Sequence, residues 1–272
     1  MDPSVMVGLI LLGIVAGILG SLFGVGGGII YIPVLTIMFG LSATEAAAIS
    51  LIGIIATSAG ASAYYAEKGV ASVRIGLYLE LGTAVGAIAG AFLAAYIQDW
   101  ILMVIFSLFL FVNAGRMILS KGRDCETKDP ESAEFTYTDL KTGEIHGYDL
   151  EHKTAGTALC VIAGAYSSMT GVGGGVIKVP VMNNLMGVPL KAATATSSYM
   201  IGITAFSGAV VYLITGSVLL DYAAFVAIGS FVGMIVGTRI SRIFDTASMK
   251  KYFSIVLIAS SISMLLKAGG IL

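Results

Sequence analysis

A glycine-rich motif occurs twice in this chain, and the spacing between its two copies is kept by many other residues. The motif Gly-Val-Gly-Gly-Gly begins at Gly24 and again, 147 positions later, at Gly171. Other pairs at this spacing are Pro33 and Pro180, Gly40 and Gly187, Ser50 and Ser197, Thr57 and Thr204, and Tyr65 and Tyr212. Such self-similarity marks a repeated structural unit. We therefore expect two copies of one unit, residues 1–120 and 154–272, joined by a polar linker at 121–153.

Long stretches of the chain, such as Val5–Phe23, carry almost no charge. Hydrophobic residues make up 57% of the chain and charged residues 11%, whereas about 25% of the residues in a soluble domain are charged. A helix needs about 20 apolar residues to cross a bilayer, and several stretches meet this need. The chain is therefore predicted to be an all-α integral membrane protein that crosses the lipid bilayer several times.

Charges and turn residues divide each copy into one glycine-interrupted segment and three continuous segments. In the first copy these are Val5–Phe39, Ser42–Ala66, Ser72–Tyr96 and Trp100–Ser120. In the second copy they are Thr154–Met186, Pro189–Ile214, Leu219–Phe244 and Ser248–Lys267. The continuous segments are predicted to be transmembrane helices. Each interrupted segment is expected to start and end on one side, and it either crosses twice as short helices or dips in and returns. Since both arms are short for a full span, we favour a broken helical hairpin.

The positive charges of the two copies lie at opposite ends of matching segments. Lys68 and Arg74 flank the turn before the third segment of the first copy, where the second copy has only Asp221. The next turn holds Asp99 in the first copy, whereas its counterpart is basic, with Arg239, Arg242, Lys250 and Lys251. Because Lys and Arg concentrate on the cytoplasmic side, we expect inverted-topology repeats like those of many secondary transporters. The 66–74 turn and the linker would then be cytoplasmic, and both termini would lie outside.

The linker contains two short stretches that are typical of strands. Phe135–Thr138 and Ile145–Tyr148 surround Lys141-Thr142-Gly143, which predicts a small β-hairpin. The linker can be a solvated connector, or a lid or docking surface.

The glycine motifs interrupt apolar segments, where unpaired backbone groups cost several kcal/mol. One interpretation is a tight turn between two helices. The other adds that a helix begins after each motif, so that its free N–H groups and partial positive charge attract an anion to the glycine backbone. We favour this second interpretation, a substrate-binding site where the two loops face each other. Its predicted glycines are Gly24, Gly26, Gly27 and Gly28 in the first copy and Gly171, Gly173, Gly174 and Gly175 in the second.

A lysine follows the second motif inside the membrane segment. Lys178 matches Tyr31 of the first copy, and a charge at this depth is costly unless it faces a cavity or a partner. Lys178 can bind the anion, pair with Glu80, or extend to the membrane surface. Glu80 can relay a proton or balance a base, and its counterpart is Ala227. Lys178 and Tyr31 are assigned to the substrate site, and Glu80 is the candidate for proton coupling.

Hydroxyl and amide side chains accompany both motifs. Ser50, its counterpart Ser197, and Asn183 are predicted to line the substrate site, because such groups can bind an oxyanion without adding a charge. Equally, such side chains often bond to the backbone or across helices in membranes.

Several functions lack the residues that they would need. No Ser-His-Asp set, HExxH motif or Walker loop is present, so no catalytic residue is assigned. Cys125 and Cys160 have no paired neighbour that would indicate a metal site. The net charge of −1 argues against a nucleic-acid partner. No cofactor and no metal are expected.

The sequence resembles the TauE/SafE family, the sulfite-exporter and toluene-sulfonate-uptake-permease group. The resemblance rests on the loops at 20–28 and 170–175 and on the stretch 178–197, and it covers nearly the whole chain. It implies transport of a sulfur oxyanion such as sulfite, or of an organosulfonate, across the plasma membrane. Proton coupling and a homodimer are further implications of this resemblance.

The leading hypothesis is a secondary transporter that moves a small anion by alternating access, with the two copies rocking around a central site. The alternatives are a passive anion channel, an intramembrane enzyme, and a receptor or assembly subunit that uses the linker.

Overall fold

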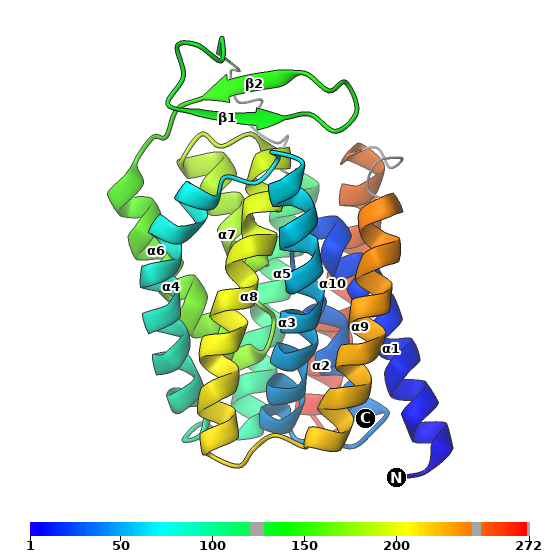
Figure 1. Cartoon of the computed structure of the whole chain (residues 1–272). Helices are drawn as coiled ribbons and strands as arrows, with labels where there is room; N and C mark the ends of the chain where they lie inside the picture. The colour runs from blue at the N-terminus through cyan, green and yellow to red at the C-terminus, as the bar shows by residue number, and fades with distance from the viewer. Residues whose placement is uncertain (120–127, 241–245, 271–272) are drawn as a thin grey trace.

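The computed structural model describes residues 1–119, 128–240 and 246–270, which form a bundle of helices with a β-hairpin at one end (Figure 1). The first helices are α1 (Pro3–Phe23), α2 (Gly28–Ile37), α3 (Ala43–Glu67), α4 (Val73–Ala94) and α5 (Asp99–Leu119). Strands β1 (Phe135–Thr138) and β2 (Ile145–Tyr148) follow. The remaining helices are α6 (Lys153–Thr170), α7 (Gly175–Pro180), the π-helix η1 (Val181–Leu185), α8 (Leu190–Ile214), α9 (Leu220–Ile240) and α10 (Thr246–Ala268).

Within the described residues, each continuous segment predicted from the sequence forms a single helix. Among the described residues, five helices, α1, α3, α4, α8 and α9, are long and apolar enough to cross a membrane, which confirms the prediction of a multi-pass, all-α membrane protein. Residues 120–127 with Cys125, residues 241–245 with Arg242, and the side chains of Lys250 and Lys251 lie outside the described part of the chain.

In each glycine-interrupted segment the first helix runs into the bundle and the next returns, so that the segment as a whole begins and ends at one end of the bundle (Figure 1). The prediction that both arms are short is wrong for α1, which has 21 residues and is a candidate span. Pro3 lies in the first turn of α1, where its missing N–H is not needed, and the apolar run that follows continues without a break. Helix α2, with 10 residues, is short as predicted.

Glycines on facing helices bring their backbones into contact. In α4, Gly82, Gly86 and Gly90 recur every four residues, a spacing that predicts close packing of helices. These glycines lie directly against α6. A Cβ atom at Gly86 would lie 2.0 Å from the carbonyl oxygen of Val161, and one at Gly233 in α9 would lie 2.1 Å from that of Ile14 in α1. Only glycine fits at such distances. Because Val161 lies 147 positions after Ile14, the contact of α4 with α6 matches that of α9 with α1.

The linker forms the predicted β-hairpin, which packs on one end of the bundle. The backbone N–H of Thr138 donates to the carbonyl of Gly69 at 2.9 Å. Tyr137 and Tyr148 are buried in one cluster with Leu79 of α4. The described linker is therefore a docked element and not a loose solvated connector.

Two ion pairs connect the hairpin segment to the helices. Lys153 lies 2.8 Å from Glu134, and Lys191 at the start of α8 pairs with Asp139. Burial alone raises the pKa of Asp139. Hydrogen bonds from Lys191 and from the N–H of Lys141, together with the Lys191 charge, outweigh burial and bring that pKa below its usual value. Asp139 is thus a carboxylate that docking stabilises in its charged form.

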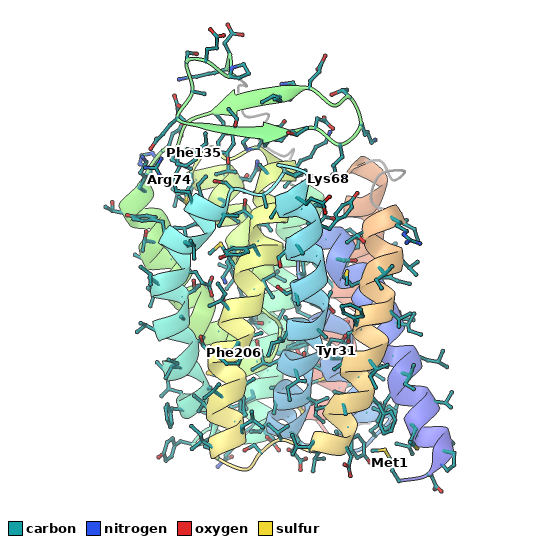
Figure 2. All side chains as sticks on the ribbon, in the orientation of Figure 1. Met1, Tyr31, Lys68, Arg74, Phe135 and Phe206 are labelled. Atoms are coloured by element: carbon teal, nitrogen blue, oxygen red, sulfur yellow. The ribbon has the colours of Figure 1, made fainter. Side chains whose placement is uncertain are left out.

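Figure 2 shows Lys68, Arg74 and Phe135 together at the hairpin end of the bundle, and Met1 at the opposite end. The end of α10 lies at the Met1 end (Figure 1). The 66–74 turn and the described part of the linker thus share one end, as expected, and Met1 and the end of α10 share the other. That the hairpin end faces the cytoplasm remains a prediction.

Candidate functional site

The two glycine motifs form loops that lie against each other inside the bundle. All residues from 24 to 28 and from 171 to 175 are buried. A Cβ atom at Gly28 would lie 2.3 Å from the carbonyl oxygen of Gly171, and one at Gly175 would lie 2.2 Å from that of Gly24. The structure therefore brings the two motifs together, backbone against backbone.

Positive φ angles explain why these loops consist of glycine. Gly24 ends α1 with a φ of 65°, and Gly171 ends α6 with a φ of 70°. The third and fourth residues of both motifs, Gly26, Gly27, Gly173 and Gly174, also have positive φ, a region that side chains with a Cβ avoid. The carbonyl of Gly174 accepts the N–H of Lys178 at 3.0 Å. The loop thereby determines where α7 begins and where Lys178 lies on it.

Ser50 and Ser197 each hold the loop of the other copy. The hydroxyl of Ser50 donates to the carbonyl of Gly171 at 2.6 Å, and that of Ser197 donates to the carbonyl of Gly24 at 3.1 Å. Both serines are fully buried. In this state the two predicted lining hydroxyls are bound to the loops and stabilise them.

Two isoleucines cover the loops. A Cβ at Gly26 would lie 2.8 Å from Ile54, and one at Gly173 would lie 3.1 Å from both Ile54 and Ile201. Ile54 and Ile201 are themselves buried and lie 147 positions apart. The structure is therefore closed around the glycine backbone.

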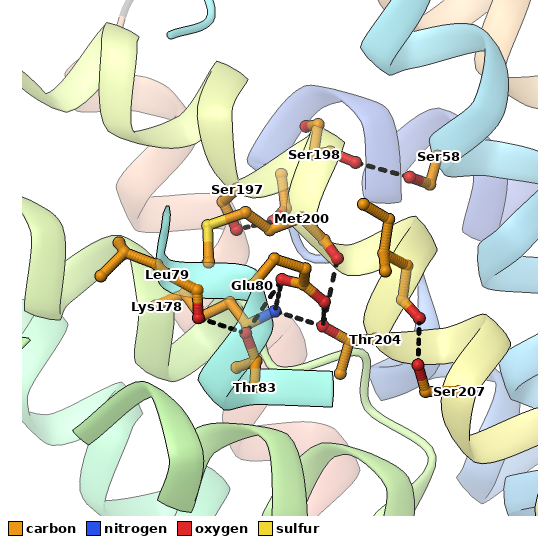
Figure 3. Close-up of polar contacts among 12 residues, drawn as sticks. Ser58, Leu79, Glu80, Thr83, Lys178, Ser197, Ser198, Met200, Thr204 and Ser207 are labelled. Carbon is orange, nitrogen blue, oxygen red and sulfur yellow. Dashed lines mark hydrogen bonds and ion pairs between the residues drawn. The ribbon is translucent and has the colours of Figure 1, made fainter. Parts of the chain in front are cut away.

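A charged cluster lies one helical turn beyond the second loop (Figure 3). The ammonium of Lys178 on α7 lies 3.2 Å from Glu80 of α4, and the two side chains are 0% and 3% exposed. Lys178 also donates to Thr204 of α8, which donates to Glu80, and Thr83 donates to Glu80 at 3.0 Å. Of the three roles open to Lys178, extension to the membrane surface is wrong. Lys178 pairs with Glu80 because a buried ammonium needs an opposite charge close by.

The matching position of the first copy holds an uncharged cluster. Tyr31 is fully buried, and its hydroxyl is hydrogen-bonded to Ser230 of α9. Ser230 lies 147 positions after Thr83, and Tyr31 lies 147 before Lys178. Ala227 stands where the second cluster has Glu80. The same geometry thus carries an ion pair on one side of the loops and a neutral hydrogen bond on the other.

Asn183 has a local contact in this structure. It lies on η1, and its side-chain amide donates to the carbonyl of Val188 at 2.9 Å. Asn183 is buried, and its neighbours Met182 and Val188 belong to the apolar cluster that also contains Tyr137 and Tyr148 of the hairpin. This bond stabilises the turn between η1 and α8.

Sequence reasoning missed two hydroxyls near the site. Thr83 was not foreseen, although it follows Glu80 by one helical turn, which is the spacing that lets two side chains of a helix meet. Ser167 of α6 is fully buried, has no hydrogen-bond partner, and lies 3.3 Å from where a Cβ of Gly174 would be. Among the described residues no group of three His, Cys, Asp or Glu side chains is placed to hold a metal ion.

The family model for the sulfite exporter TauE/SafE matches residues 9–264 of this chain, which include both loops and the charged cluster. This chain belongs to the TauE/SafE family. The TauE/SafE match agrees with the resemblance that the glycine loops indicate. No solved structure matches the chain.

Several relatives of this TauE/SafE protein are named as transporters. The "Probable membrane transporter protein YunE" of Bacillus subtilis (strain 168) is 30% identical over 92% of this chain and 93% of its own length. The "Probable membrane transporter protein MJ0441" of Methanocaldococcus jannaschii is 30% identical over 75% of this chain and 71% of its own. The "Probable membrane transporter protein MamO" of Magnetospirillum gryphiswaldense is 26% identical over 96% of this chain, which spans 45% of that protein. The TauE/SafE protein described here is thus a membrane transporter.

Proposed function

We propose that this transporter carries a small anion, a sulfur oxyanion or an organosulfonate, across the plasma membrane by alternating access. The observation that carries this proposal is Lys178, a fully buried ammonium beside the second glycine loop. It donates to the Thr204 hydroxyl, and the Thr83 hydroxyl bonds to the same Glu80 oxygen as Lys178. An ammonium and hydroxyl donors together favour a negatively charged, oxygen-rich ligand. The family description as a sulfite exporter supports the sulfur class of oxyanion.

The closed loops support a mechanism in which the transporter must rearrange to admit its substrate. Ile54 and Ile201 cover the glycine backbone, Ser50 of α3 holds the second loop, and Ser197 of α8 holds the first loop. An anion reaches Lys178 when residues 1–120 and 154–272 move relative to each other. The opposite charge bias of the two copies supports an inverted arrangement, in which one closed structure opens to either side in turn.

The test is uptake by purified protein in liposomes, with sulfite, sulfate, thiosulfate, methanesulfonate and an amino acid as candidate substrates. A transporter gives uptake that saturates and that is accelerated by the same anion on the opposite side, whereas a passive channel gives neither. Uptake of the amino acid but of none of the oxyanions would contradict the proposed substrate class.

Two matched pairs of variants test the site. Gly173→Val should abolish uptake, while Gly143→Val should not, although both glycines have positive φ and therefore share the backbone strain. Lys178→Met should abolish uptake, while Lys191→Met at the hairpin end should retain it. Each variant is first checked for insertion and for a folded, monodisperse state in detergent. Normal uptake by folded Gly173→Val or Lys178→Met protein would place the substrate elsewhere.

A further inference from the structure

We propose that the Glu80 carboxylate occupies the substrate's place in the empty transporter, and that it takes up one proton when an anion displaces it from Lys178. This inference rests on the proposed function and deepens it, because it fixes the coupling at one proton for each monovalent anion.

The contacts of Glu80 are those that an oxyanion would make. One carboxylate oxygen accepts from the Lys178 ammonium at 3.2 Å and from the Thr83 hydroxyl at 3.0 Å. The other accepts from the Thr204 hydroxyl. Figure 3 shows these donors converging on the carboxylate. A sulfonate or a sulfite presents oxygens that can accept from the same donors. The anion-binding groups are therefore already occupied, by a side chain of the protein itself.

The net charge of this cluster limits what can happen when an anion arrives. Lys178 and Glu80 are neutral as a pair, and both are buried. An anion beside an ionised Glu80 would leave one uncompensated negative charge away from water, which is strongly unfavourable. If Glu80 takes up a proton, the anion forms the contact with Lys178 and the carboxylic acid is neutral. The loaded cluster then has the same zero charge as the empty one.

A neutral empty state suits alternating access, because the carrier crosses once with its substrate and once without it. Without Glu80 the empty carrier would have to return with a lone buried ammonium. In the described part of the chain, Glu80 and Lys178 are the only charged residues among those buried. Since the matching Tyr31 cluster is neutral, the described part of each chain has one such exchange site.

Few other groups near this pair can exchange a proton. Cys160 on α6 is buried in one cluster with Leu79, the residue before Glu80. Tyr199 on α8 packs against Gly76 of α4, one helical turn before Glu80. A thiol and a phenol are ordinarily already protonated at neutral pH, and an ammonium has no site for a further proton. Glu80 is thus the group that can gain a proton when the anion binds.

The test counts the protons taken up when purified protein binds methanesulfonate, whose charge is constant over the working pH range. Titration calorimetry in buffers of different ionisation enthalpy gives this number. Wild-type protein should take up roughly one proton per anion, and its affinity should fall about tenfold per pH unit as the pH rises. Glu80→Gln should take up none and lose this pH dependence. Cys160→Ser should keep the wild-type count, because the thiol takes no part.

A second measurement needs no variant, in case Glu80→Gln does not fold. In liposomes, methanesulfonate uptake should be driven by an alkaline interior and should not respond to the membrane potential, because anion and proton move together. Anion binding without proton uptake, or uptake driven by the potential, would overturn this inference and leave the proposed function intact. Wild-type protein that binds no oxyanion at all would overturn both.

Discussion

The two copies of the repeat use the same scaffold but hold different chemistry at their buried clusters. Tyr65 donates to the carbonyl of Ser21 at 3.1 Å, and Tyr212 donates to that of Ser168 at 2.9 Å. Donors and acceptors are both 147 positions apart, so the same bond is made twice. The bonds from Ser50 and Ser197 to the loops repeat in the same way.

The clusters around the loops do not repeat. Tyr31 and Ser230 form a neutral hydrogen bond where the second copy has Lys178 and Glu80. A buried ion pair is often no more stabilising than a neutral replacement. The first copy shows that this scaffold accommodates a neutral hydrogen bond at the matching position. The fold therefore does not require the charges. The difference between the copies separates the residues that both halves of the scaffold share from the charged pair to which we assign the proposed anion site.

The largest expected change is a difference in stability between variants of the charged cluster and of the neutral cluster. Lys178→Met leaves the buried Glu80 carboxylate without a partner and should lower the free energy of unfolding by about 3–5 kcal/mol. Tyr31→Phe removes one neutral hydrogen bond and should cost about 1 kcal/mol. Denaturant unfolding in detergent measures both. The double variant Lys178→Met with Glu80→Gln should recover much of the loss. Equal losses of stability in Lys178→Met and Tyr31→Phe would show that the ion pair contributes no more to folding than the neutral hydrogen bond does.

The next effect tests whether the scaffold is the same in both copies. Gly86→Ala and Gly233→Ala each place a methyl group against a carbonyl oxygen of the facing helix, so each should destabilise the protein by about 1–3 kcal/mol. Gly115→Ala in α5 is the control, since a Cβ there meets nothing within 4 Å and alanine favours a helix. A large cost at one glycine and none at the other would mean that only one of these helix pairs supports the fold.

The elements of the fold were predictable from the sequence because their signals are local. The continuous helices follow from uncharged stretches between turns, and the hairpin follows from two alternating stretches around Lys141–Gly143. The exception is α1, because the sequence predicts two arms that are both short for a full span, whereas α1 has 21 residues. The break affects only the loop and α2, since α1 is already complete at Phe23.

The partners within the site were harder to predict, because they come from elements far apart in the chain. Glu80 and Lys178 are 98 positions apart, and the sequence alone could not decide between pairing and extension to the membrane surface. The acceptors of Ser50 and Ser197 are backbone carbonyls of the opposite copy. A backbone acceptor leaves no signature in the side chains, so only the packed structure shows it.

A smaller effect should distinguish the two loop-holding serines. Ser50→Ala and Ser197→Ala each remove one buried hydrogen bond, so each should cost about 1 kcal/mol of stability. Ser50 holds the second loop, which precedes Lys178. Its loss should therefore weaken methanesulfonate affinity about fivefold, whereas Ser197→Ala should change it less. The reverse order in a binding titration would mean that the first loop is the more important one for the anion.

The smallest effect concerns the hairpin, which has no counterpart in the first copy. Docking lowers the pKa of Asp139, so its contribution is present above the unfolded value of about 3.9 and is lost as the pH falls through the lower, docked value. The Thr138 amide donates to Gly69, and its protection from hydrogen exchange, relative to the intrinsic exchange rate at each pH, should stay high at neutral pH and fall only in acid. Asp139→Asn should lower this protection, and so accelerate exchange, at neutral pH. Asp149→Asn is the matched control, because Asp149 pairs with Lys128 within the linker and should leave docking unchanged. Equal acceleration in both variants would mean that the hairpin's own stability, and not its ion pair with Lys191, keeps it on the bundle.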